Sequence, residues 1–247
     1  MPMSLEVKFV PLTAPLQSST VLLCGPEVKL GPTGQTLDEQ SSHAVTKSAA
    51  AADFTARSKA SIEILAPSKL AAKRFVLMGS GHSPGDQECL NLGGAAFAAI
   101  TVRKGNTASI VAEFDGLTGH AASTAAADLA MGALLRSYEF KIYRTNRKND
   151  DNNGNGDRNG NDHNANATLE TLYIHTAKPD QTAEIFTARR AVAEGVAFAR
   201  DLVNEPANIL GPVEFAERVR DLTRLGLEVE ILDVEQMTEL KMGALLG

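Results

Sequence analysis

A glycine-rich loop is the first feature of the sequence whose residues could do chemistry. Residues 79–85 read Gly-Ser-Gly-His-Ser-Pro-Gly and follow the apolar run 75–78, a place where backbone N–H groups can approach a phosphate. The loop lacks the spacing of a dinucleotide-binding motif, Pro84 interrupts it, and no lysine-serine pair follows. An ordinary turn is therefore the favoured interpretation, and nicotinamide chemistry has no support.

Histidines and cysteines do not form a pattern typical of a metal site. The five histidines are scattered, without the i, i+4 spacing or the short Cys/His spacings that build zinc sites. No G-x-S-x-G segment is present for a serine nucleophile. We therefore assign no catalytic, cofactor-binding or metal-binding residue on spacing alone. The histidines considered are His43, His82, His120, His163 and His175, of which His175 ends a predicted strand and is interpreted as structural.

The carboxylates near the end of the chain were considered for acid-base chemistry, which needs a paired arrangement. They alternate with arginines, a pattern typical of a solvated helix face and strand edge rather than of a catalytic pair. The acids are Glu214, Glu217, Asp221, Glu228 and Glu230, and the bases between them are Arg218, Arg220 and Arg224.

Composition narrows the class of protein. The 247 residues are 43% hydrophobic and 22% charged, which is ordinary for a folded globular protein. The net charge of −6 gives no general attraction to nucleic acid or anionic lipid. The amino terminus lacks a secretory signal, and no apolar run approaches the ~20 residues of a membrane span. Cys24 and Cys89 are interpreted as small buried thiols, so a cytoplasmic location is expected.

Strands alternate with helices along the first 178 residues, which predicts an α/β fold with helices on both faces of a mixed or parallel sheet. The strands at 4–12 and 21–24 are expected to pair with each other. A further helix is expected to be capped by Ser123 or Thr124. The other expected strands are 61–65, 75–78, 108–114 and 168–176, and the other expected helices are 43–57 and one capped by Asp86.

The remaining segments differ in composition. Residues 146–167 are rich in Asn, Asp and Gly and are predicted to be a mobile insert within the first domain. A long helix is predicted over 182–205, ending near Pro206. Gly211-Pro212 is expected to open a helix that stops at Gly226, followed by a strand at 227–233 and a helix from Val234.

Residues 199–208, Ala-Arg-Asp-Leu-Val-Asn-Glu-Pro-Ala-Asn, resemble the linker motif of the leucine aminopeptidase family of two-metal peptidases. The resemblance continues to Gly247 through the Met-Gly-Ala-Leu-Leu-Gly segment 242–247. Asn204 and Glu205 precede Pro206, where the chain leaves a helix, so the motif is interpreted as a helix end and hinge rather than as catalytic machinery.

The resemblance implies an amino-terminal α/β domain (macro-domain-like) at 1–178, a connecting helix at 179–208 and the incomplete start of a peptidase domain at 209–247. It implies removal of an amino-terminal residue, preferably Leu, from peptides. Two divalent metals, manganese or zinc, would be held by carboxylates and a lysine that follow segment 243–247 in the family. No catalytic or metal residue therefore maps onto this chain. We expect the parent protein to form a homo-hexamer that does not associate with a membrane.

Alternatives to this interpretation stay open. The sequence ends inside an α/β unit, which indicates a fragment of a longer enzyme rather than a complete truncated product. A nucleotide- or DNA-binding module is a second hypothesis, since the family's amino-terminal domains resemble small α/β domains that bind nucleotide derivatives. The basic cluster for it is Lys141, Arg144, Arg147 and Lys148, beside Asp150 and Asp151. A truncated structural subunit is the third.

Overall fold

The computed structural model describes residues 4–67, 69–70, 72–143 and 169–246 of the chain. It divides into two compact units, Met1–Ala197 and Phe198–Gly247, called here unit 1 and unit 2. The predicted insert at 146–167 lies outside the described residues, and the expected domain boundaries at 178 and 208 stay predictions. Among the described residues, no helix has both the length and the apolar character required to cross a membrane.

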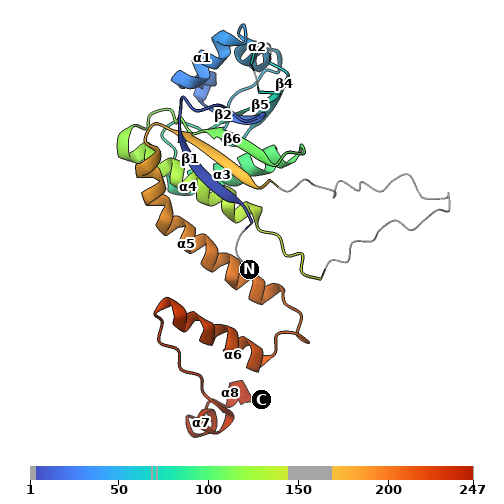
Figure 1. Ribbon diagram of the computed structural model, residues 1–247, viewed down its shortest axis with the longest axis vertical. Coiled ribbons are helices and arrows are strands. Elements are labelled where there is room, and N and C mark those ends of the chain that lie inside the picture. The colour runs from blue at the N-terminus through green and yellow to red at the C-terminus, as the bar shows by residue number, and fades with distance from the viewer. Residues whose placement is uncertain (1–3, 68, 71, 144–168, 247) are drawn as a thin grey trace, which may run out of the picture. The chain divides into compact units, whose positions relative to one another are not determined.

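Unit 1 is built on one mixed sheet with the strand order β1-β7-β6-β2-β5-β4 and with β3 on β2 (Figure 1). The first five of these are parallel to one another, whereas β3 and β4 are antiparallel to their neighbours. The expected α/β class with a mixed sheet is confirmed. The strands are β1 (Glu6–Pro11), β2 (Ser19–Gly25), β3 (Lys29–Leu30), β4 (Ser61–Leu65), β5 (Arg74–Gly79), β6 (Thr107–Val111) and β7 (Thr171–Thr176).

Helices cover both faces of the sheet, as a buried parallel sheet requires. One core lies between the sheet and α3, α4 and the first part of α5, and the other lies under α1 and α2. The helices α3 and α4 approach closely because Gly93 and Gly132 have no side chain at the crossing. These helices are α1 (Pro32–Gln40), α2 (Ala44–Ala51), α3 (Asp86–Thr101), α4 (Gly119–Ser137) and α5 (Pro179–Asn204).

The expected pairing of the first two strands is wrong. β1 pairs with β7, and β2 lies between β6 and β5, so β1 and β2 are three positions apart in the sheet. The connection 12–18 crosses a face of the sheet instead of forming a hairpin, with Leu12 and Leu16 packed against the core under α1 and α2. Gln17 fixes its end by accepting a hydrogen bond from Thr107 Oγ1 at 2.8 Å.

One helix was not expected, and two expected helix starts need correction. Helix α1 was not predicted, because its sequence is polar apart from Leu37, although Pro32 at its first turn after Gly31 is a start signal. Helix α3 has Gly85, not Asp86, as its N-cap. Helix α4 begins at Gly119 with Thr118 as N-cap, so Ser123 and Thr124 lie inside it and donate to the carbonyls of Gly119 and His120.

Unit 2 consists of the end of α5 followed by α6 (Pro212–Arg220), a 3-10 turn at Asp221–Leu225, α7 (Val234–Glu239) and α8 (Gly243–Leu246). The predicted helices at 212 and 234 are confirmed. The predicted strand at 227–233 is wrong, because these residues have no regular structure and no neighbouring strand pairs with them. An alternating pattern forms a strand only when a partner supplies the hydrogen bonds.

Candidate functional site

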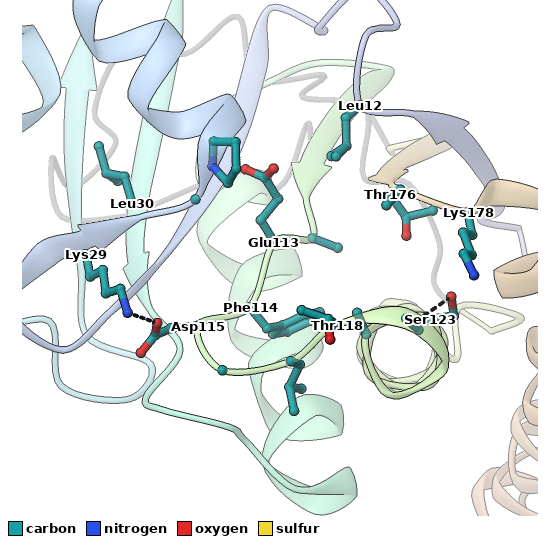
Figure 2. Close-up of a pocket in the computed structure, with 18 of the residues that line it drawn as sticks. Leu12, Lys29, Leu30, Glu113, Phe114, Asp115, Thr118, Ser123, Thr176 and Lys178 are labelled. Atoms are coloured by element: carbon teal, nitrogen blue, oxygen red, sulfur yellow. Dashed lines mark hydrogen bonds and ion pairs between the residues drawn. The ribbon is translucent and has the colours of Figure 1, made fainter.

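A pocket of about 450 Å³ opens at the carboxyl edge of the sheet in unit 1 (Figure 2). Its wall is formed by residues that follow β1, β2, β6 and β7, because the carboxyl ends of parallel strands meet at one edge. That edge is the usual ligand site of an open α/β sheet. The lining includes Leu12, Lys29, Leu30, Pro32, Gln35, Glu113, Phe114, Asp115, Leu117, Thr118, Ser123, Thr176 and Lys178.

The loop between β6 and α4, residues 112–118, supplies most of the floor. Gly116 has φ 81°, a left-handed conformation that favours glycine, and a Cβ there would also lie 2.2 Å from Ser83 Oγ. This tight turn directs the loop into the first turn of α4. Thr118, Gly119 and Ser123 therefore line the pocket together with Phe114.

Asp115 is the centre of a charged cluster at one end of the pocket. Its Oδ1 lies 2.6 Å from Lys29 Nζ and its Oδ2 lies 2.7 Å from His82 Nδ1. The hydrogen bonds from His82 and from Lys29 hold the pKa of the Asp115 carboxyl below its usual value. The carboxylate is therefore ionised at neutral pH and fixed in position by two cationic or polar partners.

Glu113 lies at the same end and joins the pocket to α1. Its carboxylate accepts hydrogen bonds from Thr33 N at 3.0 Å and from Thr33 Oγ1 at 3.1 Å. A carboxylate at a helix amino terminus is favoured by the free amides and the helix dipole. Gly31 permits the approach, since a Cβ there would lie 2.6 Å from Glu113 Oε2.

The glycine-rich loop at 79–85 does not line the pocket. Ser80 is buried and donates from Oγ to the Cys24 carbonyl at 3.1 Å, which ties β5 to β2. Gly85 caps α3, and its N–H donates to Glu88 Oε2 at 2.9 Å. The loop contacts the lining residue Asp115 in two ways, since His82 Nδ1 lies 2.7 Å from its carboxylate and the Ser83 N–H donates to its main-chain carbonyl at 2.8 Å.

The other histidines are apart from one another. His43 contacts Asp38 at 3.2 Å, and His120 lies exposed in the first turn of α4. His175 is fully buried in β7, with Nε2 2.9 Å from Ser109 Oγ, and burial lowers its pKa although the Pro11 main chain opposes this. His163 lies outside the described residues.

Both cysteines are buried and unpaired by a disulfide, as expected. Burial raises the pKa of Cys24 to about 12, and burial together with nearby carboxylates raises that of Cys89 to about 12. Neither thiol is activated as a nucleophile, since the reactive species is the thiolate.

The metals implied by the resemblance were tested against the donors that this chain offers. Within the described ranges, no three His, Cys, Asp or Glu side chains are grouped so that they could hold an ion. A catalytic site needs about three protein ligands plus an open position. The described residues therefore do not fit a catalytic metal centre.

Of the candidate acids of unit 2, Glu217 forms an exposed ion pair on α6, and Glu214 accepts a hydrogen bond from the Gly211 N–H at the start of that helix. Glu217 accepts from Arg220 at 2.7 Å, one helical turn away. Glu205 of the linker motif follows the last residue of α5 and accepts from Arg218 at 3.0 Å, which fastens the turn at Pro206 to α6. In the basic cluster only Lys141 is described, and it pairs with Glu139; Arg144, Arg147 and Lys148 lie outside the described residues.

The pocket residues were missed by reasoning from the sequence. Glu113 lies at the end of the predicted strand 108–114 and Asp115 directly follows it, which is the place where a parallel sheet gathers its ligand groups. Lys178 likewise follows β7 and precedes Pro179 at the start of α5. Lys29 could not be placed, because β3 is only two residues long.

Comparison with known proteins agrees with this architecture. A model described as "Cytosol aminopeptidase family, N-terminal domain" matches residues 21–147, about half of the chain, and one described as "Cytosol aminopeptidase family, catalytic domain" matches residues 197–247. A probable cytosol aminopeptidase of Rhodopseudomonas palustris (strain TIE-1) is 39% identical over 250 residues. That match covers 100% of this chain and 47% of the relative, so the chain spans about half the length of such relatives.

Other matches have the same character. A probable cytosol aminopeptidase of Rhizobium rhizogenes is 42% identical over 81% of this chain and 38% of its own length. A mutant of tomato leucine aminopeptidase superposes with a TM-score of 0.73 at 25% identity, over 97% of this chain and 46% of that one. The bottromycin maturation enzyme BotP, in complex with Mn, shares the fold with a TM-score of 0.62 at 20% identity, over 90% of this chain and 40% of that one.

The two family models match in the order that the linker motif indicates, and the relatives carry the name that the resemblance implied. The chain belongs to the cytosol aminopeptidase family, of which it represents the amino-terminal portion.

Proposed function

We propose that this chain is the non-catalytic amino-terminal portion of a leucyl aminopeptidase. The observation that carries the proposal is the pair of family matches, an amino-terminal domain at 21–147 and the first part of a catalytic domain at 197–247. The parent enzyme would release amino-terminal residues, preferably Leu, from peptides by two-metal hydrolysis with manganese or zinc.

The parent is proposed to be a cytosolic homo-hexamer, in which unit 1 supplies part of the assembly and restricts access of peptides. The cytosolic location is supported by the names of the relatives. The alternative of a nucleotide- or DNA-binding module is not favoured by the matches, and Lys141 of its basic cluster is neutralised by Glu139.

The test is hydrolysis of leucine p-nitroanilide with added manganese. The 247-residue chain is compared with a chimera in which these residues replace the matching amino-terminal portion of the Rhodopseudomonas relative. We expect no turnover by the chain alone and turnover by the chimera. Chelator-sensitive turnover by the chain alone would overturn the proposal, and so would a folded chimera that stays inactive while the intact relative is active.

A further inference from the structure

The pocket lies where the connections of two neighbouring strands diverge. After β2 the chain passes through α1 and α2 toward β4 and β5 on one side of the sheet, whereas after β6 it passes through α4 to β7 on the other. A crevice forms at such a switch point because the two connections leave in opposite directions. Its volume of about 450 Å³ falls within the range of small-molecule sites.

One end of the pocket is acidic. Glu113 and Asp115 place two carboxylates there, against the single ammonium of Lys29. Their present hydrogen bonds come from Thr33, Lys29 and His82. Each ionised carboxylate can accept about four hydrogen bonds, so both keep capacity for a further donor.

The opposite end is basic. Figure 2 shows Lys178 beside Ser123, across the pocket from the Lys29–Asp115 pair. Lys178 is exposed, and among the described residues its Nζ has no ion-pair or hydrogen-bond partner. The first turn of the 19-residue helix α4 begins at this end, and its N-cap Thr118 makes no side-chain capping bond. The free amides of that turn and Lys178 would act together on one anionic group.

Apolar walls join the two ends. Leu12, Leu30 and Phe114 line the pocket, and Leu30 and Phe114 are also buried residues of the two cores. A ligand with a branched or aromatic side chain would gain about 25 cal/mol for each Å² of apolar surface that it buries against these walls.

From these three features we infer that the pocket binds a short apolar peptide as its zwitterion. The ligand's ammonium faces Glu113 and Asp115, its carboxylate faces Lys178 and the α4 amino terminus, and its apolar side chain packs on Leu12 and Phe114. An uncharged ligand leaves Glu113 and Lys178 without an ionic partner, and a polyphosphate would extend its charge toward two carboxylates.

The binding does not depend on the peptidase assignment, whereas its meaning rests on the proposed function. Dipeptides are among the products that an aminopeptidase releases. A site for them in unit 1, outside the region that matches the catalytic domain, would let product concentration act on the parent enzyme. Such coupling would be regulatory and not a part of bond cleavage.

The first test is isothermal titration calorimetry of leucyl-leucine into the 247-residue chain, with mass spectrometry to show that the peptide stays intact. Saturable binding at one site is expected, weakened about tenfold or more for N-acetyl-leucyl-leucine and for leucyl-leucine amide, since each lacks one charge-assisted bond. Absence of saturable binding, equal binding of the blocked peptides, or tighter binding of adenosine monophosphate would overturn the inference. Cleavage of the peptide would instead contradict the proposed function.

The second test uses matched lysine variants. Lys178→Gln is expected to weaken leucyl-leucine about tenfold and to leave the binding of its amide unchanged, because only the former carries the carboxylate that Lys178 would contact. Lys104→Gln removes an exposed lysine before β6, at the opposite edge of the sheet, and should change neither. Circular dichroism of each variant verifies the fold. Equal effects of the two substitutions, or an equal loss for both peptides, would contradict the site.

Discussion

Units 1 and 2 share one chain but differ in what holds them together. Unit 1 has a sheet with a buried core on each face, whereas no described residue after Ala197 is buried. The short helices of unit 2 rest on local signals, such as the capping box at Asp233 and the cap at Gly211. Apolar residues exposed there include Val203, Val213, Phe215, Leu225, Leu227, Val234, Leu240 and Leu245.

This difference indicates that local signals place the helices of this chain, whereas burial against a core stabilises them. Helices of nine, six and four residues are too short to persist in water on propensity alone. Helices of unit 1 are stabilised by burial against the sheet. The exposed apolar side chains of unit 2 would gain the same stabilisation by packing against more of a catalytic domain, to which its sequence is matched.

The largest expected difference between the two units is the stability that is lost when an apolar side chain is truncated. Ile110 is fully buried in β6, and Ile110→Ala should lower the free energy of unfolding by about 2–5 kcal/mol through lost burial and a cavity. Val213 is 70% exposed, and Val213→Ala should change it by less than about 0.5 kcal/mol. Urea denaturation followed by circular dichroism measures both. Similar losses at the two positions would mean that unit 2 has a core of its own.

The next largest difference between the two units should be the stability that is lost when an ion pair is removed. Asp128 is buried in α4 and receives Arg189 Nε at 2.7 Å. Arg189→Met should cost about 3 kcal/mol, because it leaves a buried carboxylate without its partner. Arg220→Met removes the exposed pair with Glu217 in unit 2 and should cost under about 1 kcal/mol. Equal costs in thermal unfolding would show that the α4–α5 pair is not a structural link.

Replacing glycine by alanine in α4 and in α5 should change the free energy of unfolding by a smaller amount, and in opposite directions. A Cβ at Gly132 would lie 1.8 Å from the Leu90 carbonyl oxygen, so Gly132→Ala should separate α3 from α4 and cost about 1–3 kcal/mol. Gly195 lies in α5 with open space around its Cβ position, and Gly195→Ala should stabilise the helix by about 0.5–1 kcal/mol. The melting temperatures should therefore move in opposite directions. A stabilising Gly132→Ala would contradict the close helix packing.

The smallest effect depends on pH. Burial of Asp38 alone would raise its pKa, but hydrogen bonds from Thr46, His43 and Val45 outweigh it and hold the pKa below 3.8. The carboxylate therefore stabilises the fold above the ordinary pKa, and this contribution is lost as pH falls through the lowered one. Asp38→Asn should flatten the acid limb of the stability curve measured by urea denaturation at a series of pH values. An unaltered acid limb in Asp38→Asn would contradict this assignment.

Much of the fold could be predicted from the sequence, because its strands and long helices carry strong local patterns. The run at 75–78 is apolar, Leu172 and Ile174 alternate with Thr171 and Tyr173, and the helix through Ala197 has regular apolar spacing. Sheet order could not be predicted in the same way, since the crossing of residues 12–18 depends on contacts with β6 far along the chain. The alternating segment 227–233 shows the reverse, a local pattern without a partner strand.

The pocket could not be predicted from local sequence patterns, because it too depends on the order of the strands in the sheet. Glu113, Asp115 and Lys29 have unremarkable neighbours in the sequence, and only strand order brings them together. The glycine loop at 79–85, by contrast, has a distinctive sequence but serves as a turn and a helix cap. Positions after the strands of a parallel sheet would have been a better guide than motif spacing.

Hydrogen exchange of the 247-residue chain, read by mass spectrometry, tests most directly whether the two units differ as described. Amides of β6, β7 and α4 should exchange slowly because they open only with the global fold, and amides of 212–246 should exchange at the shortest labelling time. Comparable protection in both units would contradict the account, since it would require a core in unit 2 that stabilises its helices independently.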